Sequence, residues 1–258
     1  MNADPSRIGG DPGLGDAFAT DGPGPEGPAE VAGRDDGRRS WLLVIDTGTS
    51  RIAVAAAALD GSLLGQSTWA AGRTHGAQLL PAIGRLTGEA NLRRSRMRGV
   101  IVGAGPGAFT GLRVGLATAK ALAHELRIPI VGVSTGAALL DASGVGSNGV
   151  LLLPAGPNDR QVVRSGTTTR LLPGGHDPDL GPDDVLVAVD LDGRAPADAL
   201  DRGGLAAAGL AASLARLGAA RLAAGDDDDL ARLVPDYVSL PRGVERESGE
   251  VAWSRDRP

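Results

Sequence analysis

The sequence has no cysteine and very few aromatic residues, and both absences exclude classes of protein. Without cysteine there is no disulfide framework, no thiolate nucleophile and no cysteine-ligated zinc. Aromatic residues make up only 2% of the chain, so its core has to be built mainly from aliphatic side chains. No continuous run of about 18 apolar residues occurs, and the first residues do not follow the pattern of a secretory signal. These absences predict a soluble, cytoplasmic protein without a membrane span.

Glycine and proline are abundant instead, and a quarter of them lie in the first 40 residues. The 258 residues include 40 Gly and 17 Pro, and residues 1–40 contain 9 and 5 of these. Apolar residues are isolated in that stretch, so their burial cannot offset the entropy of ordering the chain. We therefore expect a disordered leader over 1–40, sub-domains over 41–140 and 141–241, and a loose tail over 242–258.

Charge is distributed unevenly along the chain. The net charge of −5 divides into −4 for residues 1–40, +6 for 41–140 and −7 for 141–258. Such asymmetry can mark a surface for an acidic partner, or it can reflect chance differences between solvated faces. The most basic stretch is 92–98, which contains Arg93, Arg94, Arg96 and Arg98. It either contacts phosphates or forms an exposed, solvated connection.

From Trp41 onward the pattern becomes that of an α/β protein. Apolar runs predict strands at 41–46, 52–60, 62–69, 98–105 and 128–134, of which the first three form antiparallel hairpins. Helical spacing predicts helices at 75–90, 109–126 and 135–142. A strand, a helix and a further strand in succession imply a parallel crossover. The second half predicts strands at 150–156, 161–172 and 185–191, a helix at 204–224 and a solvated acidic loop at 226–229.

Two motifs could carry chemistry. Asp46-Thr47-Gly48-Thr49-Ser50 follows a strand, and its carboxylate, hydroxyls and backbone N–H groups could hold a metal-bound phosphate. The same residues would also suit a hairpin turn capped by its own side chains. The glycine-rich run 105–111 lies between a strand and a helix, where it permits close approach of a phosphate or of another protein. It lacks the P-loop spacing and the dinucleotide-binding spacing.

Other catalytic patterns are absent from the sequence. His75, His124 and His176 are too far apart to form a recognisable zinc-hydrolase motif. No G-x-S-x-G sequence occurs, which argues against an α/β-hydrolase.

Four segments resemble one known family. They are LVIDTGTSRIAVA (43–55), HGAQLLPAI (75–83), GAGPGAFTGLRVGLATAKALA (103–123) and IPIVGVST (128–135). They are similar to the TsaB family, also called YeaZ, in the same order and at the family's spacing. The third string is highly specific, because paralogous families differ within it.

The resemblance implies an α/β, actin-like ATPase fold (ASKHA, ribonuclease H-like), with mixed sheets flanked by helices in two sub-domains. It implies a degenerate nucleotide cleft, of which Asp46, Thr47, Gly48 and Thr49 would be the vestige. It also implies a non-catalytic subunit of the machinery that forms N6-threonylcarbamoyladenosine at position 37 of tRNA. The partners would be a TsaD-like catalytic subunit and a TsaE-like ATPase, with tRNA contacted only indirectly. No intrinsic cofactor is expected, ATP and Mg²⁺ would bind only in the complex, and a homodimer of the chain alone is also allowed.

In this family the helices equivalent to 75–90 and 109–126 bind TsaD. The interface residues implied here are His75, Leu79, Leu80, Ile83, Phe109, Thr110, Leu112, Arg113, Leu116 and Ala119. The same side chains could instead pack on the sheet of their own chain.

The catalytic paralogue carries two metal-binding histidines, four residues apart, after the strand that resembles PIVGV. Thr135 and Leu139 stand at the matching places, and neither is an imidazole ligand. The comparison therefore predicts no metal site, no transferase activity and no protease activity. An independent ATP-dependent phosphotransferase of the same fold is the alternative, and Asp46 with its hydroxyl turn favours it. Direct contact between tRNA and Arg93–Arg98 is a third hypothesis.

Overall fold

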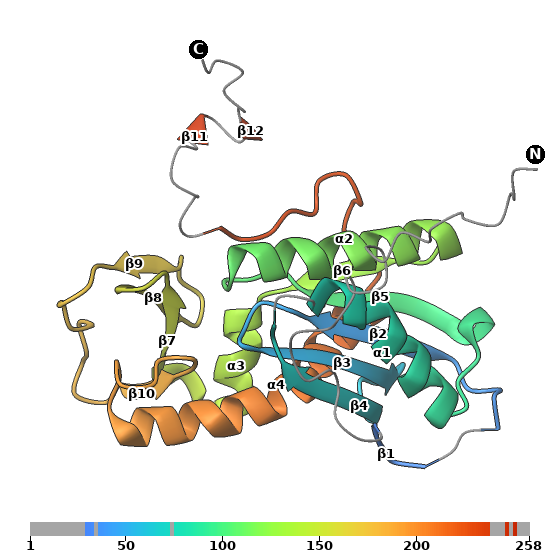
Figure 1. Ribbon diagram of the computed structural model, residues 1–258, viewed down its shortest axis with the longest axis horizontal. Coiled ribbons are helices and arrows are strands. Elements are labelled where there is room, and N and C mark those ends of the chain that lie inside the picture. Colours follow the sequence, from blue (N-terminus) through green and yellow to red (C-terminus); the bar gives the residue numbers. More distant parts are fainter. Residues whose placement is uncertain (1–28, 34–35, 73–74, 238–245, 248–249, 252–258) are drawn as a thin grey trace, which may run out of the picture.

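A computed structural model describes residues 29–33, 36–72, 75–237, 246–247 and 250–251 (Figure 1). It contains two main sheets, and the long helix α4 (Ala197–Ala223) runs from one to the other. Most of the expected leader and most of the expected tail lie outside the described residues. The described part confirms the predicted α/β class.

The first sheet has six strands in the order β1-β4-β3-β2-β5-β6. Antiparallel pairing joins β2 (Trp41–Asp46), β3 (Arg51–Ala58) and β4 (Leu63–Ala70), as the hairpin signals predict. The pairs β2–β5 and β5–β6 are parallel. The crossover helices precede β5 and β6, and their bounds complete this half: α1 (His75–Glu89), β5 (Met97–Gly103), α2 (Phe109–Leu126) and β6 (Ile130–Val133).

Three details of this half differ from the sequence prediction. A short strand, β1 (Glu30–Val31), pairs with β4, although residues 1–40 were expected to be disordered throughout. Helix α1 ends at Glu89 rather than at residue 90, and Pro81 lies in its interior. The basic connection contains a 3-10 turn, η1 (Arg94–Arg96).

The second sheet has the order β10-β7-β8-β9 and repeats the strand order of the first half. In both, three antiparallel strands are followed by a strand parallel to the first. The single strand predicted at 161–172 is wrong: the chain turns through Gly166, which has a φ of 71°. The bounds are α3 (Thr135–Ser143), η2 (Gly146–Asn148), β7 (Gly149–Ala155), β8 (Asp159–Arg164), β9 (Arg170–Leu172) and β10 (Val185–Ala188). Near the end of the chain, β11 (Arg246–Glu247) pairs with β12 (Glu250–Val251).

Strand β2 is buried on both faces, which explains its continuous apolar run. Successive side chains of a strand point to opposite faces. Leu43 and Ile45 therefore pack with α1 and α2, whereas Leu42 and Val44 pack with α4. Helices thus cover both faces of the first sheet.

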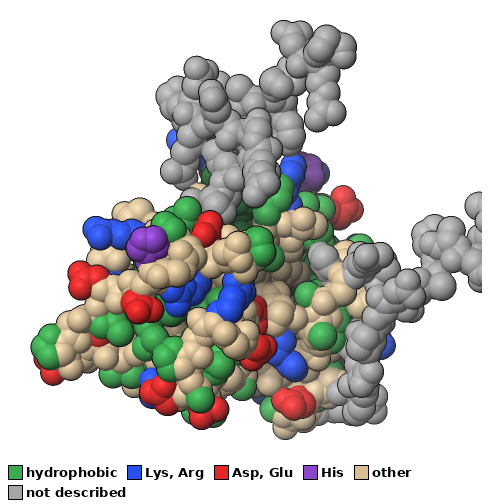
Figure 2. Space-filling model, turned by 60° about the vertical axis from the view of Figure 1, so that its left-hand side comes forward, with side chains coloured by type: hydrophobic (Ala, Val, Ile, Leu, Met, Phe, Trp, Pro, Cys, Tyr) green, Lys and Arg blue, Asp and Glu red, His purple; other side chains and the backbone are tan. Residues whose placement is uncertain are grey.

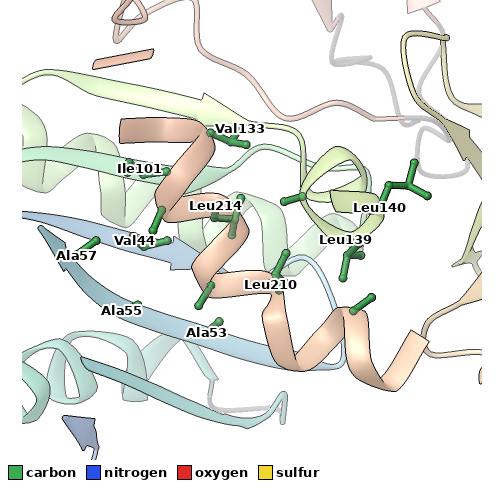
Figure 3. Packing of buried hydrophobic residues seen from close by; sticks show 14 of the residues in the cluster. Val44, Ala53, Ala55, Ala57, Ile101, Val133, Leu139, Leu140, Leu210 and Leu214 are labelled. Carbon is green, nitrogen blue, oxygen red and sulfur yellow. The ribbon is translucent and has the colours of Figure 1, made fainter. Parts of the chain in front are cut away.

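Helix α4 joins the two halves through one continuous core. Its side chains Leu210 and Leu214 meet Val44 and Ile101 of the first sheet, together with residues of α3 (Figure 3). The same cluster includes Leu151 of the second sheet, so it crosses the expected boundary between residues 140 and 141. The helix begins at Ala197 rather than at 204. By length and composition, α4 alone among the described helices could span a membrane, but its buried residues pack in this core as in a soluble protein.

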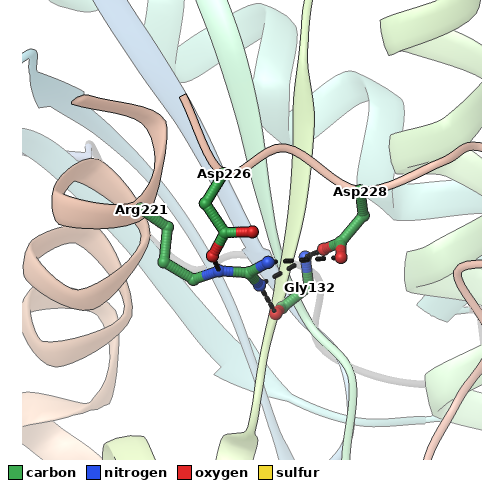
Figure 4. A network of polar contacts seen from close by, with 4 residues as sticks. All are labelled: Gly132, Arg221, Asp226 and Asp228. Carbon is green, nitrogen blue, oxygen red and sulfur yellow. Dashed lines mark hydrogen bonds and ion pairs between the residues drawn. The ribbon is translucent and has the colours of Figure 1, made fainter. Parts of the chain in front are cut away.

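The acidic residues 226–229 after α4 were expected to form a solvated loop, but hydrogen bonds and ion pairs attach them to the edge of the first sheet. Arg221 binds Asp226 at 2.7 Å and the carbonyl oxygen of Gly132 at 2.7 Å (Figure 4). The Gly132 N–H donates to Asp228 Oδ2 at 2.7 Å, and the Asp228 N–H donates to Ile130 O at 2.8 Å. Strand β6 is an edge of its sheet, and its free backbone groups need such partners. We call residues 226–237 the strap.

Candidate functional site

Asp46 ends β2 and is completely buried. Its Oδ1 accepts the Gly48 N–H at 2.9 Å, and its Oδ2 accepts the Thr135 hydroxyl at 2.7 Å. Burial raises the pKa of this carboxyl from 3.8 to about 6, although both hydrogen bonds lower it. The charge of Asp190 raises the pKa further. The carboxylate that could have bound a metal–phosphate group therefore faces the protein interior.

The N-terminal end of α2 lies directly on the turn after β2. The Thr47 hydroxyl donates to Gly111 O at 2.7 Å, and the Ala108 N–H donates to Gly48 O at 2.7 Å. A Cβ atom added to Gly111 would lie 1.9 Å from Thr47 O, so only glycine permits this approach. Thr49 is buried as well. The glycine-rich string is thus accounted for by packing within the chain.

A second contact closes the same turn from the other half of the molecule. The Ser50 N–H donates to Asp190 Oδ2 at 2.6 Å, and the Ser50 hydroxyl also binds this carboxylate. Arg194 donates to the carbonyl oxygens of Gly156 at 3.2 Å and Pro157 at 3.0 Å, in the turn between β7 and β8. The loop after β10 therefore ties the two halves together. Sequence reasoning missed Asp190, because 140 residues separate it from Ser50 and no local pattern marks the pair.

The positions that match the catalytic paralogue's histidines are both buried. The Thr135 hydroxyl holds Asp46 and accepts the Gly105 N–H at 3.3 Å. Leu139 belongs to the core cluster around α4. Among the described residues, no three His, Asp or Glu side chains are grouped so as to hold a metal ion.

The ten side chains implied for the partner interface fall into two groups. Five are buried in the core of their own chain: Leu79, Ile83, Leu112, Leu116 and Ala119. A side chain buried in this way cannot reach a partner, so these five fix α1 and α2 on the sheet. Leu80, Thr110 and Arg113 are exposed, and Phe109 is half-buried. His75 begins α1, but its side chain lies outside the described part.

The exposed residues define a surface that we call the α1–α2 face. It consists of Leu80, Pro81 and Gly84 on α1 and of Thr110, Arg113 and Ala117 on α2. The two helices are neighbours at their N-terminal ends, since a Cβ added to Gly76 would lie 3.6 Å from Val114 Cγ1.

The strap reaches the edge of this face. The ring of Tyr237 lies 4.8 Å from that of Phe109, and the Arg113 guanidinium lies 5.2 Å from the centroid of the Phe109 ring. Partial burial raises the pKa of Tyr237. The sequence offers no pattern that would have placed Tyr237 here.

Comparisons with known proteins identify related sequences over part of the chain. Residues 69–181 match the TsaD family model, described as tRNA N6-adenosine threonylcarbamoyltransferase. An uncharacterised protein of Mycobacterium leprae is 38% identical over 117 residues, which are 44% of this chain and 32% of that protein. The tRNA threonylcarbamoyladenosine biosynthesis protein TsaB of Haemophilus influenzae is 34% identical over 107 residues, 40% of this chain and 42% of that one. TsaB of Bacillus subtilis is 31% identical over 94 residues, 36% of this chain and 41% of that one.

The chain thus spans between about a third and somewhat more than half the length of the curated relatives it matches, 32% to 57%. Its fold matches more completely. The structure of YeaZ from Pseudomonas aeruginosa superposes with a TM-score of 0.59 and 21% identity, covering 77% of this chain and 99% of that one. This confirms the expected actin-like fold. By its family-model match and its TsaB-named relatives, part of the chain is similar to proteins of the TsaB/YeaZ family, and its fold is shared with YeaZ.

Proposed function

We propose that this chain is a non-catalytic subunit that binds a TsaD-like catalytic subunit in the synthesis of N6-threonylcarbamoyladenosine on tRNA. The observation that carries the proposal is the composition of the α1–α2 face, which lies on the two helices that the family resemblance assigns to the partner. The names of the TsaB relatives support a role in the same pathway. A TsaE-like ATPase would join the pair in the complete machinery.

The α1–α2 face has the chemistry of a protein interface. Leu80 is 57% exposed in the isolated chain, although it is a large apolar side chain on a helix. Pro81 and Gly84 are exposed beside it on α1, and Gly84 has no side chain, so the backbone of a partner helix could approach closely there. Apolar anchors of this kind, near the centre of an interface, contribute most of the binding energy.

The interior of the molecule supports a non-catalytic role. Thr135 and Leu139 are not metal ligands, and both are used in packing. In the turn after β2, the Thr47 hydroxyl donates to Gly111, the Gly48 N–H to Asp46 and the Ser50 N–H to Asp190. A nucleotide phosphate would have to displace these partners. An ATP-dependent phosphotransferase is therefore the weaker alternative, and calorimetry with Mg-ATP on the isolated chain distinguishes it through tight binding and turnover.

The partner proposal is tested by changing one exposed leucine in the face and one outside it. Leu80→Asp introduces a charge into the α1–α2 face, and Leu205→Asp makes the same change on α4, where Leu205 is 70% exposed. We expect Leu80→Asp to weaken binding to the TsaD-like subunit of the same organism by at least about 30-fold, the effect of losing a strong anchor. Leu205→Asp should bind within about twofold of the unchanged chain.

Binding is measured by titration calorimetry, and thermal unfolding shows that both variants fold. Equal affinity of the two folded variants would contradict the proposed interface. Failure of the unchanged chain to bind any TsaD-like subunit would contradict the proposed function as a whole.

A further inference from the structure

Two basic segments that are distant in sequence lie together where β2 and β5 begin. The strands run parallel, with Trp41 opposite Met97. Arg98 Nε donates to Ser40 Oγ at 3.3 Å, and a Cβ added to Gly37 would lie 2.9 Å from Arg93 Nε. Residues 36–40 therefore adjoin residues 91–98. Together these segments contain six arginines and a single carboxylate, that of Asp36. We call the six the arginine patch: Arg38, Arg39, Arg93, Arg94, Arg96 and Arg98.

Among the described residues, Asp36 meets Arg38 and the charge of Arg39 acts on Asp60, whereas the other four arginines of the patch have no carboxylate partner. All six arginines are exposed. Arg38 meets Asp36 at 3.9 Å with its side chain 85% exposed, and within the described ranges none of the four arginines of 91–98 forms an ion pair. Elsewhere Arg164, Arg202, Arg216 and Arg221 each bind an aspartate. The two segments thus have a net charge of +5 on a chain whose net charge is −5.

The face that includes the second sheet does not resemble this patch. On the face that includes the second sheet, acidic and basic side chains are interspersed, with scattered hydrophobic ones between them (Figure 2). Such a mixed surface has no preference for a polyanion. The concentration of positive charge therefore does not extend to this face.

The backbone that carries the arginines is held in place. The Trp41 indole N–H donates to Arg93 O at 2.9 Å, and the Arg96 N–H donates to the same oxygen at 2.9 Å. Leu92 and Met97, on either side of the 3-10 turn, are buried in the core. A ligand would therefore meet guanidinium groups on a fixed backbone, and ordering of the loop would cost little on binding.

We propose that the arginine patch binds the phosphate backbone of tRNA directly. A guanidinium group fits two phosphate oxygens at once, and contacts of this kind supply most of the non-specific affinity for nucleic acids. The choice of tRNA rests on the proposed function, in which tRNA is the substrate of the complex. The proposal develops the third sequence hypothesis, direct contact through Arg93–Arg98, and extends the basic surface to Arg38 and Arg39.

The composition of the patch favours a polyanion over an acidic protein. Protein interfaces have an apolar centre, usually with aromatic or aliphatic anchors. The large apolar side chains of the two segments and of the adjoining strand starts, Trp41, Leu92 and Met97, are all buried. What remains on the surface is guanidinium, hydroxyl and backbone, with the Asn91 amide and the single Asp36 carboxylate, which suits sugar-phosphate and gives a protein partner no apolar anchor.

The salt dependence of binding follows from the number of phosphates engaged. If four arginines each neutralise one phosphate, the slope of log affinity against log salt is about −3 to −4. Affinity should then fall on the order of 10²-fold between about 50 and 200 mM salt.

The test measures binding of the full chain to fluorescent, unmodified tRNA by anisotropy over that salt range. Arg94→Ser/Arg96→Ser removes two charges from the patch, and Arg170→Ser/Arg232→Ser removes two from exposed sites elsewhere. We expect the patch variant to bind at least about tenfold more weakly at low salt, with a slope shallower by roughly 1.5. The control should stay within about twofold, and Arg94→Lys/Arg96→Lys should retain most of the affinity because it keeps the charge.

Equal losses in the patch variant and its control would overturn the proposal. So would a patch variant that keeps its tRNA affinity but no longer binds the TsaD-like subunit, because the patch would then bind a protein. The Leu80→Asp measurement separates the two proposals. A chain that binds tRNA through the patch but does not bind the TsaD-like subunit contradicts the proposed function alone.

Discussion

The environment of Asp46 determines whether the turn after β2 can bind a ligand. Asp46 stands at the end of β2, where the sequence pattern allowed a carboxylate that binds a metal-bound phosphate, yet it is completely buried. Its two hydrogen-bond donors are Thr135 and Gly48, and both belong to the chain itself. Burying a charged group is costly unless its bonds are satisfied, and these two donors only partly offset that cost here, since the pKa rises to about 6.

The raised pKa of Asp46 predicts a particular pH dependence of stability. Its folded pKa of about 6 exceeds the ordinary 3.8, so the unfolded chain releases the proton first as pH rises. Stability from this group is therefore complete below about pH 4 and is lost as pH rises to about 6, by roughly 3 kcal/mol in total. The Asn side chain of Asp46→Asn cannot ionise, so this component should vanish in the variant.

Urea unfolding of both proteins between pH 4 and 7 measures the effect. The free energy of unfolding of the unchanged chain should fall relative to Asp46→Asn over that range. The comparison is needed because aspartates with lowered pKa, such as Asp184 and Asp226, act in the opposite direction. Parallel curves for the two proteins would show that Asp46 does not titrate as described.

For single residues, the sequence indicates which element carries a side chain but not how deeply that side chain is buried. Asp46 is recognisable as a strand-end carboxylate, and Leu112 and Leu116 as an apolar stripe. Whether an apolar stripe faces the chain's own sheet or a partner depends on what packs against it. Helical periodicity gives no information about that. The hydroxyl of Thr135 on Asp46 was unpredictable for the same reason, since 89 residues separate the pair.

Helix α2 is positioned by the absence of side chains at its N-terminal end. Besides Gly111, a Cβ at Gly115 would lie 2.2 Å from Thr47 Oγ1, and one at Gly107 would lie 2.3 Å from Gly48 O. These close approaches place α2 directly on the turn after β2. They thereby fix the positions of Thr110 and Arg113, which are exposed on the other side of the helix. The glycines support the α1–α2 face from within.

A pair of glycine substitutions tests this role of α2. Gly111→Ala should destabilise the chain by about 1–3 kcal/mol, because the new methyl group meets the Thr47 backbone at 1.9 Å. Gly84→Ala on α1 meets nothing within 4 Å and should stabilise it by about 0.5–1 kcal/mol, through its higher helix propensity. Thermal or urea unfolding gives both values. A neutral Gly111→Ala would mean that α2 does not rest on the turn.

Elements with strong local patterns were predictable, and those defined by distant contacts were not. The hairpins of β2, β3 and β4 and the helices α1 and α2 follow from apolar periodicity and turn residues. Strand β1 and the strap have no such signal, because each is held by pairing with an edge of the sheet. Residues 226–229 do form the predicted loop, and three of the four aspartates are exposed, but the prediction missed that Arg221 binds Asp226 and Asp228.

On the scale of the whole molecule, two similar halves share one core and are joined by polar contacts. Helix α4 packs on both sheets, Asp190 binds the turn after β2, and Arg194 binds the turn after β7. A cavity of about 570 Å³ remains between the halves, lined by Arg51 and Thr68 of the first sheet and by Asp190 of the second half.

The two proposed surfaces adjoin the same helix. The α1–α2 face includes the exposed side of α1, and the arginine patch begins just beyond its C-terminal end at Glu89. A TsaD-like subunit bound to this face would therefore lie close to the patch, so tRNA could contact both chains in one complex.

The most direct test of the non-catalytic subunit role is reconstitution of the modification reaction. Unmodified tRNA and threonylcarbamoyl-AMP are supplied, and the modified nucleoside is quantified with this chain alone, with its TsaD-like and TsaE-like partners alone, and with all three. We expect product only when all three are present, with Leu80→Asp lowering the yield at least about tenfold and Leu205→Asp leaving it unchanged. Product formed by this chain alone, or full activity of the partners without it, would contradict the account.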